Sequence, residues 1–184
     1  MREKHIWRKL ARPLALLFPI IYILTNKNIV LLLVGIVTAI AVALETAKFF
    51  SFRKLRVIYR SEEKKRISSL CLFLVAIFFT FLFFQKEIAI TAINFLIVGD
   101  LAAWFVGTRF GKTRIIGKKT LEGALAFFFS ALLIGIIFNA AFNFGLAFYI
   151  ILAGALSATA VEIAPIGEDN LTVALISAII MSVI

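Results

Sequence analysis

The sequence has very few of the residues that build zinc sites or disulfide frameworks. Its 184 residues include one cysteine and one histidine. A lone cysteine cannot form an internal disulfide, and Cys71 lies in an apolar run, so we expect a small buried side chain there. With so few sulfur and imidazole ligands, a zinc or iron site is not expected. Any metal must be held by carboxylates, which suit Mg²⁺ or Mn²⁺.

Acidic residues are also scarce, since 10 of them face 20 lysines and arginines. The basic segments contain no nucleic-acid recognition motif, so we expect no nucleic-acid partner. What the chain does have is apolar surface: 62% of its residues are hydrophobic and 20 are phenylalanine. A soluble domain is about half apolar. We therefore interpret residues 1–184 as a single integral membrane domain.

Seven apolar segments follow one another along the chain. They lie at residues 13–25, 28–45, 67–84, 88–106, 120–138, 144–161 and 170–184. A helix needs about 20 residues to cross a bilayer core, and segments three to six fit that length, whereas the first and last are short. We predict an all-α, polytopic transmembrane bundle of about seven spans. The short outer segments leave room for a partner subunit, so a homodimer stays open.

Charge predicts the orientation of the bundle. With seven spans, the N-terminus and the loops after segments two and four share one side and carry 18 of the 20 basic residues, leaving Lys27 and Lys86 opposite. Cytoplasmic loops carry the basic excess, so the N-terminus is predicted to be cytoplasmic. Nine of the ten acids map to the same side, and Glu87 is the exception. Transporters usually place polar groups near the midplane. This asymmetry favours an enzyme at the cytoplasmic face of a prokaryotic inner membrane.

Asp100 stands inside an apolar run, about six residues (roughly 9 Å of helix) before the expected end of segment four. Intramembrane acids are functional candidates by default. The simpler alternative is a carboxylate that pairs with Arg109 and stabilises the bundle.

The stretch GTRFGKT, Gly107–Thr113, is similar to a phosphate-binding P-loop but has only three residues between its glycines and follows a membrane helix. We regard the likeness as accidental. Lys118, Lys119 and Thr120 then lead into segment five, and a helix N-terminus with adjacent lysines can bind phosphate. Glu122 lies in that first turn, where complementing the helix dipole is the simpler role. An ordinary basic cytoplasmic loop remains the alternative.

A second group of acids, Glu162, Glu168 and Asp169, precedes the last segment. Carboxylates this close repel one another unless a cation or a basic partner lies among them. Mg²⁺ held by one or two of them together with substrate phosphates would remove the repulsion. Asp169 or Asn170 can also cap the following helix.

The motifs GD-x-x-A (99–103), G-x-x-FGK (107–112), GKKTLEG (117–123) and an acid followed by DNLT (162 and 169–172) occur in this order. Over residues 95–175 the chain resembles the CTP-dependent lipid kinases, namely dolichol kinase, phytol kinase and the CTP-type diacylglycerol kinase. The resemblance implies transfer of the γ-phosphate of CTP to a lipid hydroxyl with a divalent metal. Carried over residue by residue, it implies a site that contains Asp100, Lys118, Lys119, Glu122, Glu162, Asp169 and Asn170. From the chemistry of the residues we infer catalytic roles for Asp100, Glu122 and Asp169, metal binding by Asp100, Glu162 and Asp169, and nucleotide binding by Gly111, Lys112, Lys118, Lys119, Thr120 and Asn170.

Two alternatives remain. Phosphatidate cytidylyltransferases share the K-K-T-x-E-G pattern, but they carry a C-terminal stretch with Lys-Asp, His-Gly-Gly and Asp-Arg that is absent here. A non-enzymatic small transporter or scaffold is the second. The N-terminal third matches the kinases poorly, since Arg12 stands where a histidine is expected. The acceptor is open between polyprenols such as dolichol, phytol-type alcohols and diacylglycerol.

Overall fold

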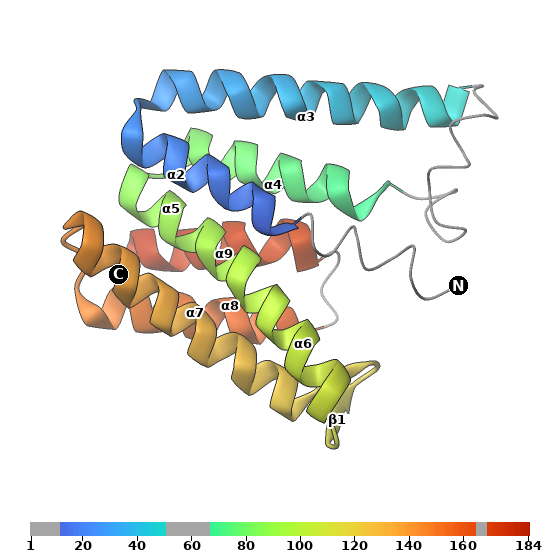
Figure 1. The fold of residues 1–184 in the computed structure, drawn as a ribbon, viewed down its shortest axis with the longest axis vertical. Helices are drawn as coiled ribbons and strands as arrows, with labels where there is room; N and C mark the ends of the chain where they lie inside the picture. Colours follow the sequence, from blue (N-terminus) through green and yellow to red (C-terminus); the bar gives the residue numbers. More distant parts are fainter. Residues whose placement is uncertain (1–11, 51–66, 165–168) are drawn as a thin grey trace.

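The computed structural model describes residues 12–50, 67–164 and 169–184, which fold into seven helical rods (Figure 1). The rods are η2 (Arg12–Leu16) with α2 (Leu17–Leu24), α3 (Lys27–Phe50), α4 (Ser69–Phe83), α5 (Lys86–Asn94) with the π-helical η4 (Phe95–Gly99) and α6 (Asp100–Phe110), α7 (Leu121–Phe142), α8 (Phe148–Ile163), and α9 (Asp169–Val183). Each predicted apolar segment coincides with one rod. The prediction of a helical bundle is confirmed.

Among the described residues, three helices are long and apolar enough to cross a membrane: Lys27–Ala47, Lys86–Phe110 and Leu121–Phe142. We expected segments three and six to be long enough as well, and this is wrong. Their helices α4 and α8 have 15 and 16 residues. The first begins only after its N-cap Ser68, and the second is preceded by a turn in which Asn143 is left-handed. The seven-span topology and its orientation stay predictions.

A β-hairpin interrupts the helical pattern, which the all-α prediction missed. Strands β1 (Arg114–Ile116) and β2 (Lys119–Thr120) are antiparallel. Gly117 opens the two-residue turn with φ 57°, the pattern of a type II′ hairpin turn. A strand therefore follows the GTRFGKT stretch where a P-loop would open a helix.

The rods run in alternating directions, so the connections gather at two ends of the molecule (Figure 1). At one end, Lys27 Nζ donates to the carbonyl of Leu82 at 2.8 Å, and Lys86 Nζ donates to that of Ile23 at 3.3 Å. These are the two lysines that the sequence assigned to the less basic side. The two ammonium groups thereby offset the partial negative charge at the C-terminal ends of α4 and α2.

The other end is called the hairpin end below. It comprises the hairpin and the helix ends at Ser69, Phe110, Leu121, Ile163 and Asp169. The C-terminus lies opposite it (Figure 1).

Glycines allow the π-helical segment to pack closely on two neighbours. Phe95 is fully buried, and a Cβ at Gly135 of α7 or Gly154 of α8 would come within 2.8 or 2.9 Å of its ring. A Cβ at Gly99 would meet the ring of Phe127 at 2.7 Å. These contacts need residues without side chains. They fix the backbone of η4, and therefore the start of α6, against α7 and α8.

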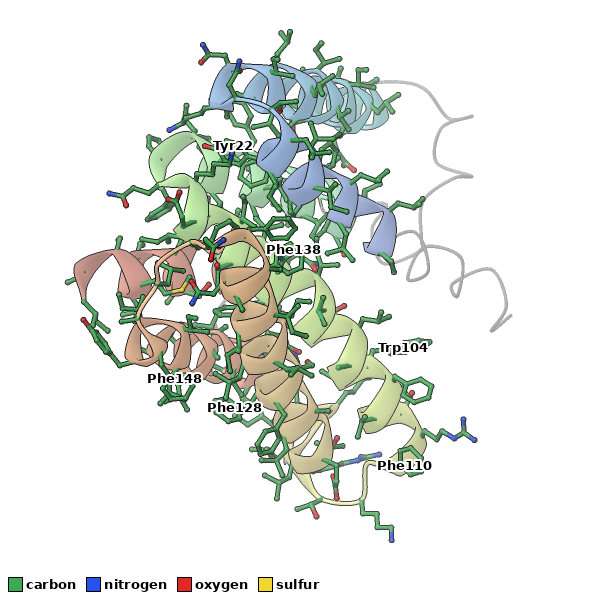
Figure 2. All side chains as sticks on the ribbon, turned by 60° about the vertical axis from the view of Figure 1, so that its left-hand side comes forward. Tyr22, Trp104, Phe110, Phe128, Phe138 and Phe148 are labelled. Atoms are coloured by element: carbon green, nitrogen blue, oxygen red, sulfur yellow. The ribbon has the colours of Figure 1, made fainter. Side chains whose placement is uncertain are left out.

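Large apolar side chains cover much of the outside of the rods. Figure 2 shows Phe128 on α7 and Phe148 on α8, the latter 58% exposed. Water-soluble monomers rarely expose contiguous apolar surface on this scale. The outer surface therefore agrees with a bilayer environment.

Candidate functional site

A cavity of about 380 Å³ lies at the hairpin end, between α6, the hairpin, the start of α7 and the end of α8. Five predicted site residues line it together: Asp100, Lys118, Lys119, Thr120 and Glu162. Asp100, Trp104 and Thr108 recur at helical spacing, so one face of α6 forms a wall. The helix rod runs on to Phe110, and Asp100 therefore lies roughly 15 Å from its end, deeper than the sequence suggested.

Lys119 joins three elements through its ammonium group. Its Nζ donates to Glu162 Oε1 of α8 and to Asp169 Oδ2 of α9, the second at 2.6 Å. The Glu162 side chain is 8% exposed, whereas Lys119 and Asp169 keep about a third of their exposure, at 34% and 33%. Burial alone lowers the pKa of Lys119, but the hydrogen bonds to Asp169 and Glu162 and their charges raise it above 10.5. The ammonium therefore stays charged at neutral pH.

This ion pair changes the argument for a metal. The repulsion between Glu162 and Asp169 is already relieved by a basic partner, so crowding alone no longer requires a cation. Glu168 lies outside the described residues. In the part of the chain that the structure describes, no three acidic, histidine or cysteine side chains form a metal-binding group.

The donor set still fits a magnesium ion. Glu162 and Asp169 direct one oxygen each at a single ammonium nitrogen, so two oxygens converge on one cationic centre. Mg²⁺ is commonly held by one or two carboxylates, with water and substrate phosphates completing the shell. Asp100 lines the same cavity from the α6 side.

The glycines of this region serve packing. A Cβ at Gly111 would lie 2.3 Å from the carbonyl of Gly107, and one at Gly123 would lie 3.1 Å from the carbonyl of Ala103. Thr120 Oγ1 accepts a hydrogen bond from Gly123 N at 3.2 Å and caps α7. Close approach of α6, α7 and the hairpin therefore explains these glycines without a phosphate ligand.

Five predicted residues are not among those that line the cavity: Gly111, Lys112, Glu122, Asp169 and Asn170. The Glu122 carboxylate accepts from Thr113 N at 3.1 and 3.3 Å, which ties the segment before β1 to α7. Asn170 Nδ2 donates to Ser69 Oγ at 2.9 Å and joins α9 to α4. The contacts of Glu122 and Asn170 hold elements together, Asp169 is linked to the cavity by its ion pair with Lys119, and the predicted roles of all five residues stay predictions.

Sequence reasoning missed Trp104 and Thr108 on the cavity wall. They stand four and eight residues after Asp100, so helical periodicity gave a signal that was not used. It also missed a link to the N-terminal helices, where buried Glu45 of α3 accepts from Ser68 N at 3.2 Å. Ser68 and Ser69 thus connect α3 and α4 to α9, which carries Asp169.

The fold and the site define a class of protein: a helix bundle with a charged cavity at one end and, in its described part, three helices apolar enough to cross a membrane. The chain matches the cytidylyltransferase family over residues 3–173 and belongs to it. It is 29% identical over 165 residues to an uncharacterized protein of Rickettsia prowazekii (strain Madrid E), covering 84% of this chain and 80% of that protein. No solved structure matches. At the level of the family, the match supports a CTP-using enzyme of membrane lipids.

Proposed function

We propose that the protein is a CTP-dependent kinase that phosphorylates the hydroxyl of a membrane lipid at the cytoplasmic face. The observation that carries the proposal is the cavity at the hairpin end, where Lys119 lies between Glu162 and Asp169 and Asp100 lines the α6 wall. Family membership supports CTP as the donor. The long apolar rod Lys86–Phe110 ends beside the cavity and the long apolar helix α7 begins beside it, so a lipid acceptor has a short path to it.

The reaction asks for positioning and charge neutralisation more than for covalent chemistry. The lipid oxygen would attack the γ-phosphorus, the bond from that phosphorus to the bridging oxygen would break, and CDP would leave. The proton of the hydroxyl must pass to a base. Asp100 is our choice, because it lines the cavity from the α6 wall, while Glu162 and Asp169 form the pair that holds Lys119.

Glu162 and Asp169 are the residues that would hold a divalent cation. When bound, such a cation neutralises the phosphate oxygens. Lys119 would then exchange its two carboxylate partners for the phosphates, and Lys118 lines the cavity beside it. The hairpin would thus present two adjacent ammonium groups to the triphosphate.

Cytidylyl transfer is the second candidate, and the family match favours it. In that reaction a phosphatidate oxygen would attack the α-phosphorus, and pyrophosphate would leave. The two reactions place different atoms of CTP on the lipid, so they can be separated directly.

The test incubates the purified protein in vesicles with CTP labelled at either the α- or the γ-phosphate. Polyprenol, phytol-type alcohol, diacylglycerol and phosphatidate are offered in turn, with Mg²⁺. Label entering lipid only from the γ-position supports the kinase, and label only from the α-position refutes it. Asp100→Asn should abolish transfer, whereas Glu87→Gln, the matched change at the opposite end, should not. Failure of every acceptor and label would favour the transporter or scaffold.

A further inference from the structure

The hairpin exposes apolar side chains that nothing in the described protein covers. Ile115 and Ile116 are neighbours on β1, which pairs with β2 with a register shift between Arg114 and Ile116. Both are exposed, at 41% and 42%, and Phe110 at the end of α6 is 55% exposed. Packing within the chain therefore does not account for these three side chains.

Cations surround these apolar groups. Arg109, Lys112, Arg114 and Lys118 are all exposed, and within the described ranges none of them forms an ion pair. The guanidinium of Arg109 lies 5.7 Å from the ring of Phe110, an arrangement in which an aromatic face supports a cation. The nearby acid, Glu122, is bonded to the backbone of Thr113. The segment is therefore both apolar and positively charged.

The position of the segment says what can cover it. The two helices that flank it, the rod ending at Phe110 and α7 starting at Leu121, are two of the three long apolar helices. A short connection between two such helices lies where they leave the bilayer. Figure 2 shows Phe110 at that end of α6, with Trp104 further along the same helix.

We propose that the segment Phe110–Ile116 docks onto the surface of the membrane that holds the protein, with Lys112 and Arg114 on anionic lipid headgroups. Apolar side chains embed in the headgroup region, and each basic residue near an anionic surface adds attraction that salt screens. Lys118, Lys119 and Thr120 of the same hairpin line the cavity. Docking therefore holds one wall of the cavity against the lipid surface.

The experiment places an environment-sensitive fluorophore on Ile115→Cys in a Cys71→Ala background. The labelled protein is reconstituted into vesicles of phosphatidylcholine alone or with about 30% phosphatidylglycerol, enough to give a negative surface potential. Both leaflets have the same composition, so either orientation of the protein presents the hairpin to the same lipid. The matched control carries the label on Gln85→Cys, which is exposed at the opposite end.

We expect the emission at position 115 to shift to the blue in anionic vesicles and to return on adding salt, with no such response at position 85. Lys112→Gln and Arg114→Gln should each lower the ratio of docked to undocked label about fivefold. Equal emission in both vesicles, or a shift that neither substitution weakens, would overturn the proposal. A shift caused by CTP in neutral vesicles would also overturn it, by assigning the segment to the nucleotide. Since no lipid substrate is present, failure here is separate from failure of the kinase assignment.

Discussion

Replacing Lys119 with methionine is the sharpest test of how the site is held together. The substitution keeps a long side chain but removes the charge that joins β2 to α8 and α9. Glu162, which is 8% exposed, would lose its cationic partner while remaining next to Asp169. Two carboxylates would then face each other without the lysine between them.

The expected cost follows from the exposures. An exposed ion pair contributes at most about 1 kcal/mol, whereas removing one partner of a fully buried pair costs about 3–5 kcal/mol. Lys119 and Asp169 retain a third of their exposure and Glu162 is nearly buried, so this pair lies between the limits. We expect Lys119→Met to lower the free energy of unfolding by about 2–3 kcal/mol.

The assay is reversible unfolding in mixed detergent micelles, followed by circular dichroism. Lys118→Met is the matched control, because Lys118 lines the same cavity but is exposed and makes no ion pair in the described part of the chain. This control substitution should change the free energy of unfolding by less than about 0.5 kcal/mol. Lys119→Met combined with Glu162→Gln should recover about 1 kcal/mol or more, since the charge of the carboxylate that lost its lysine is gone. Equal effects of the two lysine substitutions, or strict additivity in the double variant, would refute the reasoning.

Three further predictions use the same protein. The folded-state pKa of Lys119 is raised above 10.5, so its contribution to the free energy of unfolding is fully present below pH 10.5 and is lost as the pH rises through the folded-state pKa. The difference in stability between the wild type and Lys119→Met should therefore stay constant between about pH 7 and 9.5 and disappear above pH 10.5. A difference that appears only at high pH would contradict this. Gly154→Ala should cost about 1–3 kcal/mol in the unfolding assay, because the added Cβ would lie 2.6 Å from the buried Met181 side chain and 2.9 Å from the ring of Phe95, and an unchanged stability would show that both side chains can move. A Trp7→Phe variant keeps Trp104 as its one tryptophan, so CTP should change its emission on entering the cavity; binding seen by calorimetry without any change in emission would place the nucleotide elsewhere.

The helices could be predicted because a long apolar run with few prolines or glycines forms an α-helix in lipid. In that helix every backbone N–H and C=O group is hydrogen-bonded within its own segment. All seven runs became rods for this reason. The hairpin could not be predicted in the same way. Its strands have three and two residues, too short for an alternating pattern to show, and they lie among basic residues that read as a loop.

The sequence predicted which residues belong to the candidate site better than it predicted the contacts between them. Lys119, Glu162 and Asp169 were each singled out, and the structure brings them together. Their pairing, across 43 and 50 residues of sequence, depends on where α8 ends and α9 begins beneath the hairpin. The role of the glycines could not be predicted. A sequence cannot distinguish a glycine that lets the backbone approach a phosphate from one that packs against a backbone carbonyl, and Gly111 packs against the carbonyl of Gly107.

Competition for two oxygens distinguishes a metal site from a purely structural ion pair. Glu162 and Asp169 each offer Lys119 an oxygen, so the ammonium and a divalent cation would compete for the same place. Lys119→Met should therefore bind Mn²⁺ more tightly than the wild type, although it is less stable. In the metal-free wild type, the carboxylates are stabilised by their hydrogen bonds to Lys119, and a cation must replace these bonds. Removing one charge-assisted hydrogen bond of about 1.5 kcal/mol from the metal-free protein corresponds to about a tenfold gain in Mn²⁺ affinity.

The decrease of the free Mn²⁺ signal in electron paramagnetic resonance measures that affinity without any substrate. Glu162→Gln and Asp169→Asn should each weaken Mn²⁺ binding in the same background. A purely structural ion pair predicts the reverse order for Lys119→Met, because loosening α8 and α9 would scatter the two carboxylates and lower the affinity. The sign of one change in affinity therefore decides whether these carboxylates serve the reaction or only the fold.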